Sequence, residues 1–420
     1  MTRKTFVHVL CASALGCMLS GAASVADAWT YKTLYTFCTL KGCRDGRHPA
    51  GGVILDASGN LYGTTEFGGD KDSGVIFKLV RDEHTGNYSY TRLKSFCQSR
   101  LCADGAYPMG ELILDTAGGL YGTTSGGSGY GEAYRLDRGG TFRILHLFCP
   151  DRGSCPDGEA PVSGLTYVGA SNGLPYDGNS PLYGTTLGGG AHSHNGTVYQ
   201  LTYGIPNWVE TVLYSFCSQA NCVDGSHPVP RLLADQGGVL YGTTQEGGVG
   251  NPWDGGTVFR LDYDQELQSW QHTVLRSFCV ETDCHDGDEP NAAVVKLKGT
   301  LFGVTVFGGA NGLGEAYRLA DDGSSYHVIY SFCTPPDCAD GVYPNSLVLA
   351  GATTLYGTQL SMVFQLHRNS DGTWHKTTIK KFDCAPCDLS QLALDPNGNI
   401  FGTVYQGGVH DAGFVFELSQ

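Results

Sequence analysis

A five-residue frame, Asp-Gly-x-z-Pro, recurs six times, and the residue before its proline differs from copy to copy. These pre-proline residues are His48, Tyr107, Ala160, His227, Glu289 and Tyr343. Imidazole, carboxyl and phenol groups can transfer protons, which makes all of them except Ala160 candidates for catalytic acid–base chemistry. The same side chains could bind a sugar or a metal ion, or could simply pack over the proline and cap the loop. A constant frame with a variable residue is typical of function carried on a rigid fold.

A second set of recurring loops, each marked by a Gly-Gly pair, carries aromatic residues that could bind a ligand. An exposed aromatic ring beside polar groups suits stacking on a sugar ring. The candidates are Phe67, Trp253, Phe307 and Tyr405. The same loops hold His192 and His194, but two such residues without a third ligand nearby are a weak signal for metal binding, and we predict no metal site there.

The aspartates of the Asp-Gly pairs allow two interpretations. They are Asp45, Asp104, Asp157, Asp224, Asp286 and Asp340. Carboxylate oxygens are preferred calcium ligands, so calcium is one interpretation. The other is that each aspartate accepts hydrogen bonds from the backbone of its own turn. We expect the turn role and no cofactor, with calcium kept as the alternative.

Several familiar catalytic motifs are absent from the sequence. It contains no G-x-S-x-G, no P-loop, no H-E-x-x-H and no dinucleotide-binding fingerprint between a strand and a helix. It also contains no nucleophile and base at a fixed spacing. The motifs therefore do not identify a reaction, and catalysis depends on residues that the fold must bring together.

The elements that must position these residues repeat along the chain. The motif Leu-Tyr-Gly-Thr-Thr at Leu61 returns in related form at Leu120, Leu182, Leu240, Leu301, Leu355 and Ile400, 45 to 62 residues apart. Between copies, short apolar runs are bounded by Gly, Asp or Asn, as in strands joined by hairpins. The period predicts seven four-stranded antiparallel blades of an all-β propeller. A linear β-solenoid is the alternative, but its rungs are usually about half as long.

The two ends of the chain predict how the ring closes. The outermost-strand pattern first occurs at 30–37, before any other blade strand, and the last unit stops after its third strand at 414–418. Seven complete blades therefore form only if residues 30–37 complete the C-terminal blade, which also removes an open sheet edge. Antiparallel order places the Asp-Gly and Gly-Gly loops on one face, around a central pore. Glu111 and Arg231 would lie just below the pore mouth and bind ligand there.

Cysteines are paired along the chain, one pair after each outermost strand. The pairs are Cys38/Cys43, Cys97/Cys102, Cys149/Cys155, Cys217/Cys222, Cys279/Cys284, Cys333/Cys338 and Cys384/Cys387. In an exported protein such pairs indicate local disulfides, whereas in a cytosolic one they could bind zinc or be redox-active.

The N-terminus resembles an export signal. Residues 1–28 combine a basic start, an apolar run and a small-x-small cleavage pattern before Trp29, and we place the propeller in residues 29–420. We therefore expect a secreted or periplasmic monomer with no transmembrane segment, with lipid anchoring at Cys17 as an alternative. The net charge of −15 argues against nucleic-acid partners.

These residues resemble a known family. The chain contains the pattern G-x-L-Y-G-T-T-x-x-G-G followed by G-T-V-F-x-L, for example at Leu240–Thr244 and Gly256–Leu261. This pattern resembles the repeat of the GloVer tandem-repeat proteins, a choice-of-anchor family of secreted bacterial β-propellers. The resemblance spans nearly all of residues 29–420. It implies a propeller and export, and it brings no catalytic residues.

The sequence supports three functional hypotheses. The leading one is a module that binds a glycan or an extracellular or envelope protein through the face that holds the pre-proline residues. The alternative is a polysaccharide hydrolase or lyase that uses the pore-mouth His, Tyr and Glu residues. The third is a structural spacer.

Overall fold

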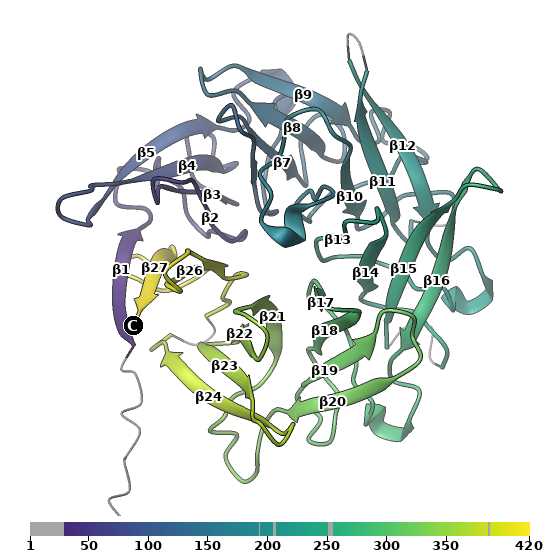
Figure 1. Ribbon diagram of the computed structural model, residues 1–420. Helices are drawn as coiled ribbons and strands as arrows, with labels where there is room; N and C mark the ends of the chain where they lie inside the picture. The colour runs from purple at the N-terminus through teal and green to yellow at the C-terminus, as the bar shows by residue number, and fades with distance from the viewer. Residues whose placement is uncertain (1–28, 193, 205–206, 251–254, 385–386) are drawn as a thin grey trace, which may run out of the picture.

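Seven antiparallel sheets surround a common axis in the computed structural model (Figure 1). The structure describes residues 29–192, 194–204, 207–250, 255–384 and 387–420. The predicted export signal 1–28, with Cys17, and the predicted ligand-binding residue Trp253 lie outside these residues. No helix of the described part is long and apolar enough to cross a membrane.

Except in blade three, each blade runs from an inner strand to a longer outer strand. Blade one contains β2 (Ile54–Leu55), β3 (Leu61–Thr65), β4 (Val75–Arg81) and β5 (Tyr88–Ser95). Blade two contains β6 (Ile113–Leu114), β7 (Leu120–Thr124), β8 (Glu132–Leu136) and β9 (Phe142–Leu147). Blade three contains β10 (Leu182–Thr186), β11 (Thr197–Tyr203) and β12 (Trp208–Ser215). Blade four contains β13 (Leu233–Ala234), β14 (Leu240–Thr244), β15 (Thr257–Asp264) and β16 (Ser269–Ser277).

The remaining blades repeat this order. Blade five contains β17 (Val295–Leu297), β18 (Thr300–Thr305), β19 (Glu315–Ala320) and β20 (Tyr326–Ser331). Blade six contains β21 (Pro344–Leu349), β22 (Thr354–Gln359), β23 (Met362–Arg368) and β24 (Trp374–Lys381). Blade seven contains β25 (Ala393–Leu394), β26 (Ile400–Val404), β27 (Phe414–Ser419) and β1 (Thr30–Thr36). Short 3-10 turns occur at η1 (Arg100–Cys102), η2 (Ala170–Asn172), η3 (Ala220–Cys222) and η4 (Thr282–Cys284).

The predicted closure of the ring is confirmed. Strand β1 pairs antiparallel with β27, from Thr30 opposite Ser419 to Thr36 opposite Phe414. In Figure 1 the N-terminal strand lies beside the C-terminal strands in one sheet. The seventh sheet therefore joins both ends of the chain, and its outer edge is covered.

Blade three departs from the expected four strands. Its sheet has three, and the inner strand is reduced to a single bridge between Thr166 and Tyr183. The residues that form a tight hairpin in the other blades are replaced here by a long connection, residues 167–181, that leaves the sheet.

The repeated Leu-Tyr-Gly-Thr-Thr motif is explained by packing within and between blades. A Cβ on Gly63 would lie 2.7 Å from the Phe77 ring of the next strand, so only glycine fits beside that ring. The first threonine reaches the neighbouring blade, as Thr123 Oγ1 donates to Ser163 O at 2.7 Å. The second closes its own loop, as Thr65 Oγ1 donates to Phe67 O at 2.8 Å. The motif is therefore structural.

The hydrophobic core lies between neighbouring blades. Between blades seven and one, Phe37, Leu61 and Phe77 are fully buried against Phe401 and Val415. Burying a side chain of this size contributes about 1.5–3 kcal/mol. The ring is therefore held together by the contacts between its sectors, and each sheet depends on both neighbours.

Candidate ligand-binding face

The disulfide loops form the outer part of the face that holds the Asp-Gly and Gly-Gly loops, called the crossover face below. All seven predicted disulfides are present: Cys38–Cys43, Cys97–Cys102, Cys149–Cys155, Cys217–Cys222, Cys279–Cys284, Cys333–Cys338 and Cys384–Cys387. Each joins residues three to six positions apart. The bridges stiffen the connection between one blade and the next.

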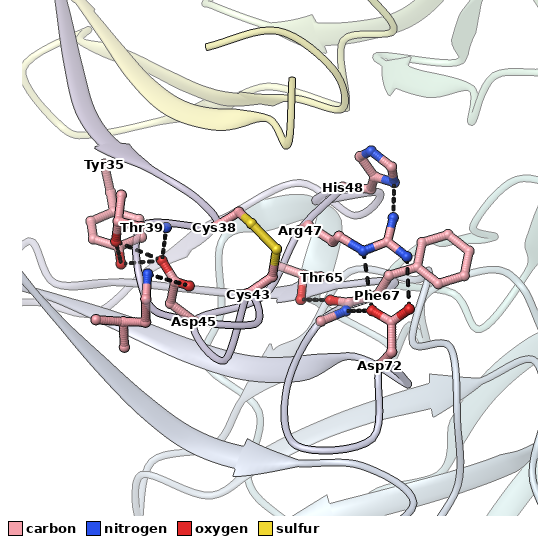
Figure 2. The surroundings of a disulfide bond; sticks show 12 residues. Tyr35, Cys38, Thr39, Cys43, Asp45, Arg47, His48, Thr65, Phe67 and Asp72 are labelled. Atoms are coloured by element: carbon pink, nitrogen blue, oxygen red, sulfur yellow. Dashed lines mark hydrogen bonds and ion pairs between the residues drawn. A yellow bond between two sulfur atoms is a disulfide. The ribbon is translucent and has the colours of Figure 1, made fainter. Parts of the chain in front are cut away.

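The aspartate of each Asp-Gly pair caps its disulfide loop, and Figure 2 shows this for Asp45. The Asp45 carboxylate is fully buried and accepts hydrogen bonds from Thr39 N at 2.9 Å, Thr39 Oγ1 at 2.8 Å, Leu40 N at 3.2 Å and Tyr35 OH at 2.7 Å. Asp224 makes the same four kinds of contact. These donors lie five to ten residues earlier in the chain, so the aspartate ties the loop to the outer strand instead of closing its own turn. The contacts favour this capping role over calcium binding.

In blade two, the hydrogen bonds of such a cap keep the Asp104 carboxylate ionised. Burial alone would raise the pKa of Asp104, but hydrogen bonds from Lys94, from the Ser99 hydroxyl and amide, and from the Gln98 amide outweigh it and lower the pKa to about 2. The Lys94 Nζ lies 2.5 Å from Asp104 Oδ2. The carboxylate therefore stays ionised and bound to protein donors.

The backbone of every pre-proline residue clamps two blades together. His48 N donates to Ala412 O of blade seven at 2.8 Å, and His48 O accepts from Glu66 N of blade one at 2.9 Å. Tyr107 and His227 repeat this pair of bonds in their own blades. All six pre-proline residues adopt left-handed φ values between 51° and 59°. Non-glycine residues rarely adopt this conformation, which persists only where the surroundings enforce it.

The proline of the frame packs on a glycine of the preceding blade. A Cβ on Gly74 would lie 2.5 Å from Pro108 Cδ, and one on Gly413 would lie 2.5 Å from Pro49 Cδ. Both glycines have positive φ. The frame is therefore a joint between blades, and its backbone leaves the pre-proline side chain free to vary.

Four aromatic side chains make a continuous series across blades seven, one and two, which we call the aromatic arc. The His48 ring stacks on Tyr405 with centroids 4.7 Å apart and contacts Phe67 edge-on at 5.8 Å. Phe67 in turn contacts Tyr107 at 5.6 Å. Tyr107 is 38% exposed, while the other three are half-buried. The arc therefore presents ring edges and faces to solvent.

Charged groups border the aromatic arc (Figure 2). Arg47 forms two hydrogen bonds with Asp72, at 3.1 and 2.8 Å, and its guanidinium lies 4.7 Å from the Phe67 ring centroid. Burial and the Arg47 charge lower the pKa of His48, which therefore favours the neutral imidazole. Tyr405 OH donates to Glu66 Oε2 at 2.6 Å; burial first, and this bond second, raise the pKa of Tyr405.

The other pre-proline candidates belong to separate contacts. His227 Nδ1 lies 3.2 Å from Glu246 Oε2, and Gln245 Nε2 donates to Glu289 Oε2 at 3.4 Å. Tyr343 contacts Phe307 of blade five at 5.2 Å. Each side chain is thus engaged by a neighbouring Gly-Gly loop.

Two predicted ligand-binding residues from different blades meet near the axis. Arg231 Nη1 donates to Glu111 Oε2 at 2.7 Å, and the Glu111 side chain is 14% exposed. These residues are 120 positions apart, so only the closed ring joins them. They form an ion pair that joins blades two and four, and their role in ligand binding stays a prediction.

Potential metal ligands do cluster in two places among the described residues. The clusters are Cys149, Cys155 and Glu159, and Cys279, Cys284 and Asp288. In both, the sulfur atoms are engaged in disulfides and so cannot act as thiolate ligands. His194 contacts Glu159 at 3.0 Å. These arrangements do not favour a metal site.

One cleft of the structure was not predicted from the sequence. A cleft of about 790 Å³ lies on the face opposite the crossover face, between the inner hairpins of blades one and two and the 167–181 connection. The sequence does carry a signal for the extra connection, in the distance from the end of an outer strand to the next Leu-Tyr-Gly-Thr-Thr motif. This distance is 34 positions from Phe148 to Leu182, but 24 positions from Phe96 to Leu120.

A family model for the Gloeobacter/Verrucomicrobia repeat matches residues 23–178 and 168–365, which together span most of the chain. The chain belongs to this family. The predicted family resemblance is thereby confirmed, and the seven blades show how the Gloeobacter/Verrucomicrobia repeat folds. A search of curated proteins found no match to this sequence.

Solved structures similar to this member of the Gloeobacter/Verrucomicrobia repeat family include two lyases. Virginiamycin B lyase from Staphylococcus aureus is 12% identical with a TM-score of 0.58, and the match covers 93% of this chain and 99% of that one. A streptogramin B lyase is 14% identical with a TM-score of 0.56, over 93% of this chain and 97% of that one. At this identity the likeness shows a shared fold alone.

Proposed function

We propose that the protein is an exported module that binds a neutral glycan through the aromatic arc of its crossover face. The observation that carries the proposal is the unbroken contact series Tyr405–His48–Phe67–Tyr107 across three blades. Sugar rings present flat C–H faces that pack on aromatic rings, while their hydroxyls need hydrogen-bonding groups close by. Arg47, Glu66 and Asp72 provide such groups at the border of the arc.

Three further properties support a glycan as the ligand. The chain carries 41 acidic and 26 basic residues, so a polyanion would be repelled at long range. The arc crosses blade boundaries, which suits an extended chain of several sugar units. Seven disulfides are typical of proteins that fold in an oxidising compartment, where envelope and extracellular glycans occur. An extracellular protein is the other partner that such a face could take.

Export itself is part of the proposal. We infer that residues 1–28 direct secretion or periplasmic delivery and are removed before Trp29, which leaves residues 29–420 as the mature propeller. Mass spectrometry of the protein isolated from the cell exterior and the periplasm would give its first residue. A mature chain that begins at Cys17 with an acyl group would instead establish lipid anchoring.

The binding test combines a glycan array with calorimetry on the ligands that the array identifies. Tyr107→Ala and Phe67→Ala should each weaken binding by about tenfold, because each removes one ring from the stacked series. Tyr263→Ala is the matched control, because Tyr263 is 39% exposed and lies at the far end of β15, away from the crossover face. Equal losses in all three variants, or none in the arc variants, would refute the assignment.

A second candidate function is a carbohydrate-active enzyme, a hydrolase or lyase, and one observation favours it. The Glu246 carboxylate holds His227 Nδ1 at 3.2 Å, which would orient the imidazole as a general base. Product analysis of array ligands after incubation with the protein distinguishes the two. Turnover that His227→Ala abolishes supports the enzyme, and unchanged ligands support the binding module.

A further inference from the structure

The cleft on the face opposite the crossover face, called the basal cleft, is a second site that the proposed glycan function does not use. Its volume of about 790 Å³ lies within the range of small-molecule pockets. Leu55 of blade one, Leu114 of blade two and Leu174 of blade three contribute apolar surface to its lining. Arg231 contributes from blade four, so the cleft extends inward to the ion pair near the axis.

The wall that distinguishes this cleft is the 167–181 connection of blade three. It is fixed by buried Tyr176, whose carbonyl accepts from Thr116 N at 3.0 Å and whose ring contacts Tyr121 at 5.1 Å. Tyr167 OH donates to Leu174 O at 2.5 Å. The wall is thus built onto blade two, yet it leaves Leu174 53% exposed. The connection therefore adds an exposed apolar side chain to a cleft that also contains Leu55 and Leu114, and a concave site lined in this way suits a ligand with an apolar body.

Some of the charged side chains that line the cleft form ion pairs, and others do not. Asp115 is paired with Arg135 Nη2 at 3.1 Å and Asp137 with Arg135 Nε at 3.1 Å. Arg138 makes no ion pair among the described residues, and the same holds for Lys78, which lies over the Tyr62 ring at 4.9 Å. Asp56, the third acidic group of the lining, makes no ion pair among the described residues and instead accepts hydrogen bonds from Ser58, Asn60 and Tyr62. Lys78 and Arg138 are the cationic side chains of the lining that remain without a carboxylate partner in the described part of the chain.

At the inner end of the cleft, the Arg231 guanidinium can donate hydrogen bonds to a ligand. Arg231 gives one N–H to Glu111, and its other guanidinium N–H groups have no hydrogen-bond partner within the part of the chain that the structure describes. A guanidinium presents several donors in a fixed plane, which matches the two oxygens of a carboxylate or a sulfonate.

We propose that the basal cleft binds a small anionic amphiphile, a molecule with an apolar ring body and one carboxylate or sulfonate group. The ring body would lie on Leu55, Leu114 and Leu174, and the acid group would face Arg231. This site is separate from the aromatic arc, so a ligand in one leaves the other accessible.

The test uses 8-anilino-1-naphthalenesulfonate, which has an aromatic body and one sulfonate, as a fluorescent probe of the folded, oxidised protein. Saturable binding of one probe per chain is expected, and Leu174→Asp and Arg231→Gln should each weaken it by about tenfold or more. Leu174 is exposed on a connection, so its variant tests the site even if Arg231→Gln perturbs the ring. Tyr107→Ala on the crossover face is the control and should leave the probe affinity within about twofold.

Ionic strength gives a second readout. Raising NaCl from about 0.05 M to about 0.5 M should weaken probe binding to the parent protein, and this effect should shrink in Arg231→Gln. Binding that is not saturable, or that neither variant changes, would overturn the proposal. Loss of glycan binding in Leu174→Asp would also overturn it, because the two sites would then not be separate.

Discussion

Two buried glutamates should each contribute more to the stability of this propeller in acid than at mildly alkaline pH. Glu132 and Glu315 begin the third strand of blades two and five, where blade one has Val75 and blade four has Thr257. Both are almost fully buried, and in each case one carboxyl oxygen has no hydrogen-bond partner among the described residues. Burial is the main cause that raises the pKa of each to about 7 from an ordinary value of 4.5.

The magnitude follows from the difference in proton binding between the folded and unfolded states. Above pH 4.5 the unfolded chain releases the proton, while the folded protein keeps it until about pH 7. The contribution of each protonated glutamate to the free energy of unfolding is therefore fully present below pH 4.5, and it is lost as the pH rises through the folded pKa of about 7. At about 1.4 kcal/mol per pH unit, each glutamate removes about 3 kcal/mol between these limits.

Urea unfolding followed by circular dichroism at about pH 4 and about pH 8, with the disulfides kept oxidised, measures this difference. Glu132→Gln keeps the size of the side chain but cannot ionise, so its free energy of unfolding should vary less with pH by about 3 kcal/mol. At alkaline pH the variant should be more stable than the parent. Glu83→Gln, at an exposed position, is the control.

A Glu132→Gln variant with the same pH dependence as the parent and the control would refute the reasoning. It would mean that the carboxyl is already ionised in the folded protein, and that the Thr124 hydroxyl and the surrounding backbone solvate the charge. The Glu315 variant then serves as an independent check in another blade.

The joints between blades give three further predictions. Ala160→Gly should stabilise the protein by about 1 kcal/mol, seen as a higher midpoint in calorimetry, because Ala160 has a φ of 51° and glycine carries no Cβ penalty there. Asp45→Ala should cost about 3 kcal/mol in urea unfolding, because it leaves the Thr39 and Leu40 amides without their acceptor; an unchanged midpoint would contradict the capping role. Gly413→Ala should lower the thermal midpoint by an amount equivalent to about 2 kcal/mol or more, because its Cβ would meet Pro49, and a stable variant would contradict the joint.

The architecture could be predicted from the sequence because it depends on counting repeated units. Seven motif copies and seven outer-strand patterns require residues 30–37 to pair with the last strand, and β1 does so. The paired cysteines could likewise be predicted because each pair is local in sequence. In contrast, the left-handed conformation of His48 and the contact of Pro49 with Gly413 depend on the neighbouring blade, which no local pattern reports.

The sites were harder to predict for a related reason. The sequence placed Glu111 and Arg231 near the axis, but their pairing at 2.7 Å depends on how closely the inner segments approach one another. A Cβ on Gly110 would lie 2.6 Å from Ser163 O, so these segments are in direct contact. The basal cleft depends on where the 167–181 connection folds. An alignment of the repeats shows these residues as an insertion, but it does not show where they lie in the fold.

The location of the aromatic arc links binding to closure of the ring. An aromatic pair forms where the Gly-Gly loop of one blade and the pre-proline residue of the next are both rings, and such pairs join blade seven to one, one to two, and five to six. The first two are consecutive and share blade one, which produces a series instead of an isolated pair. His48 is held in place by Ala412 of the C-terminal blade, and that blade is completed by β1. The arc therefore lies across the seam where the two ends of the chain meet, and a chain that cannot close its ring cannot assemble the surface that we propose for glycan binding.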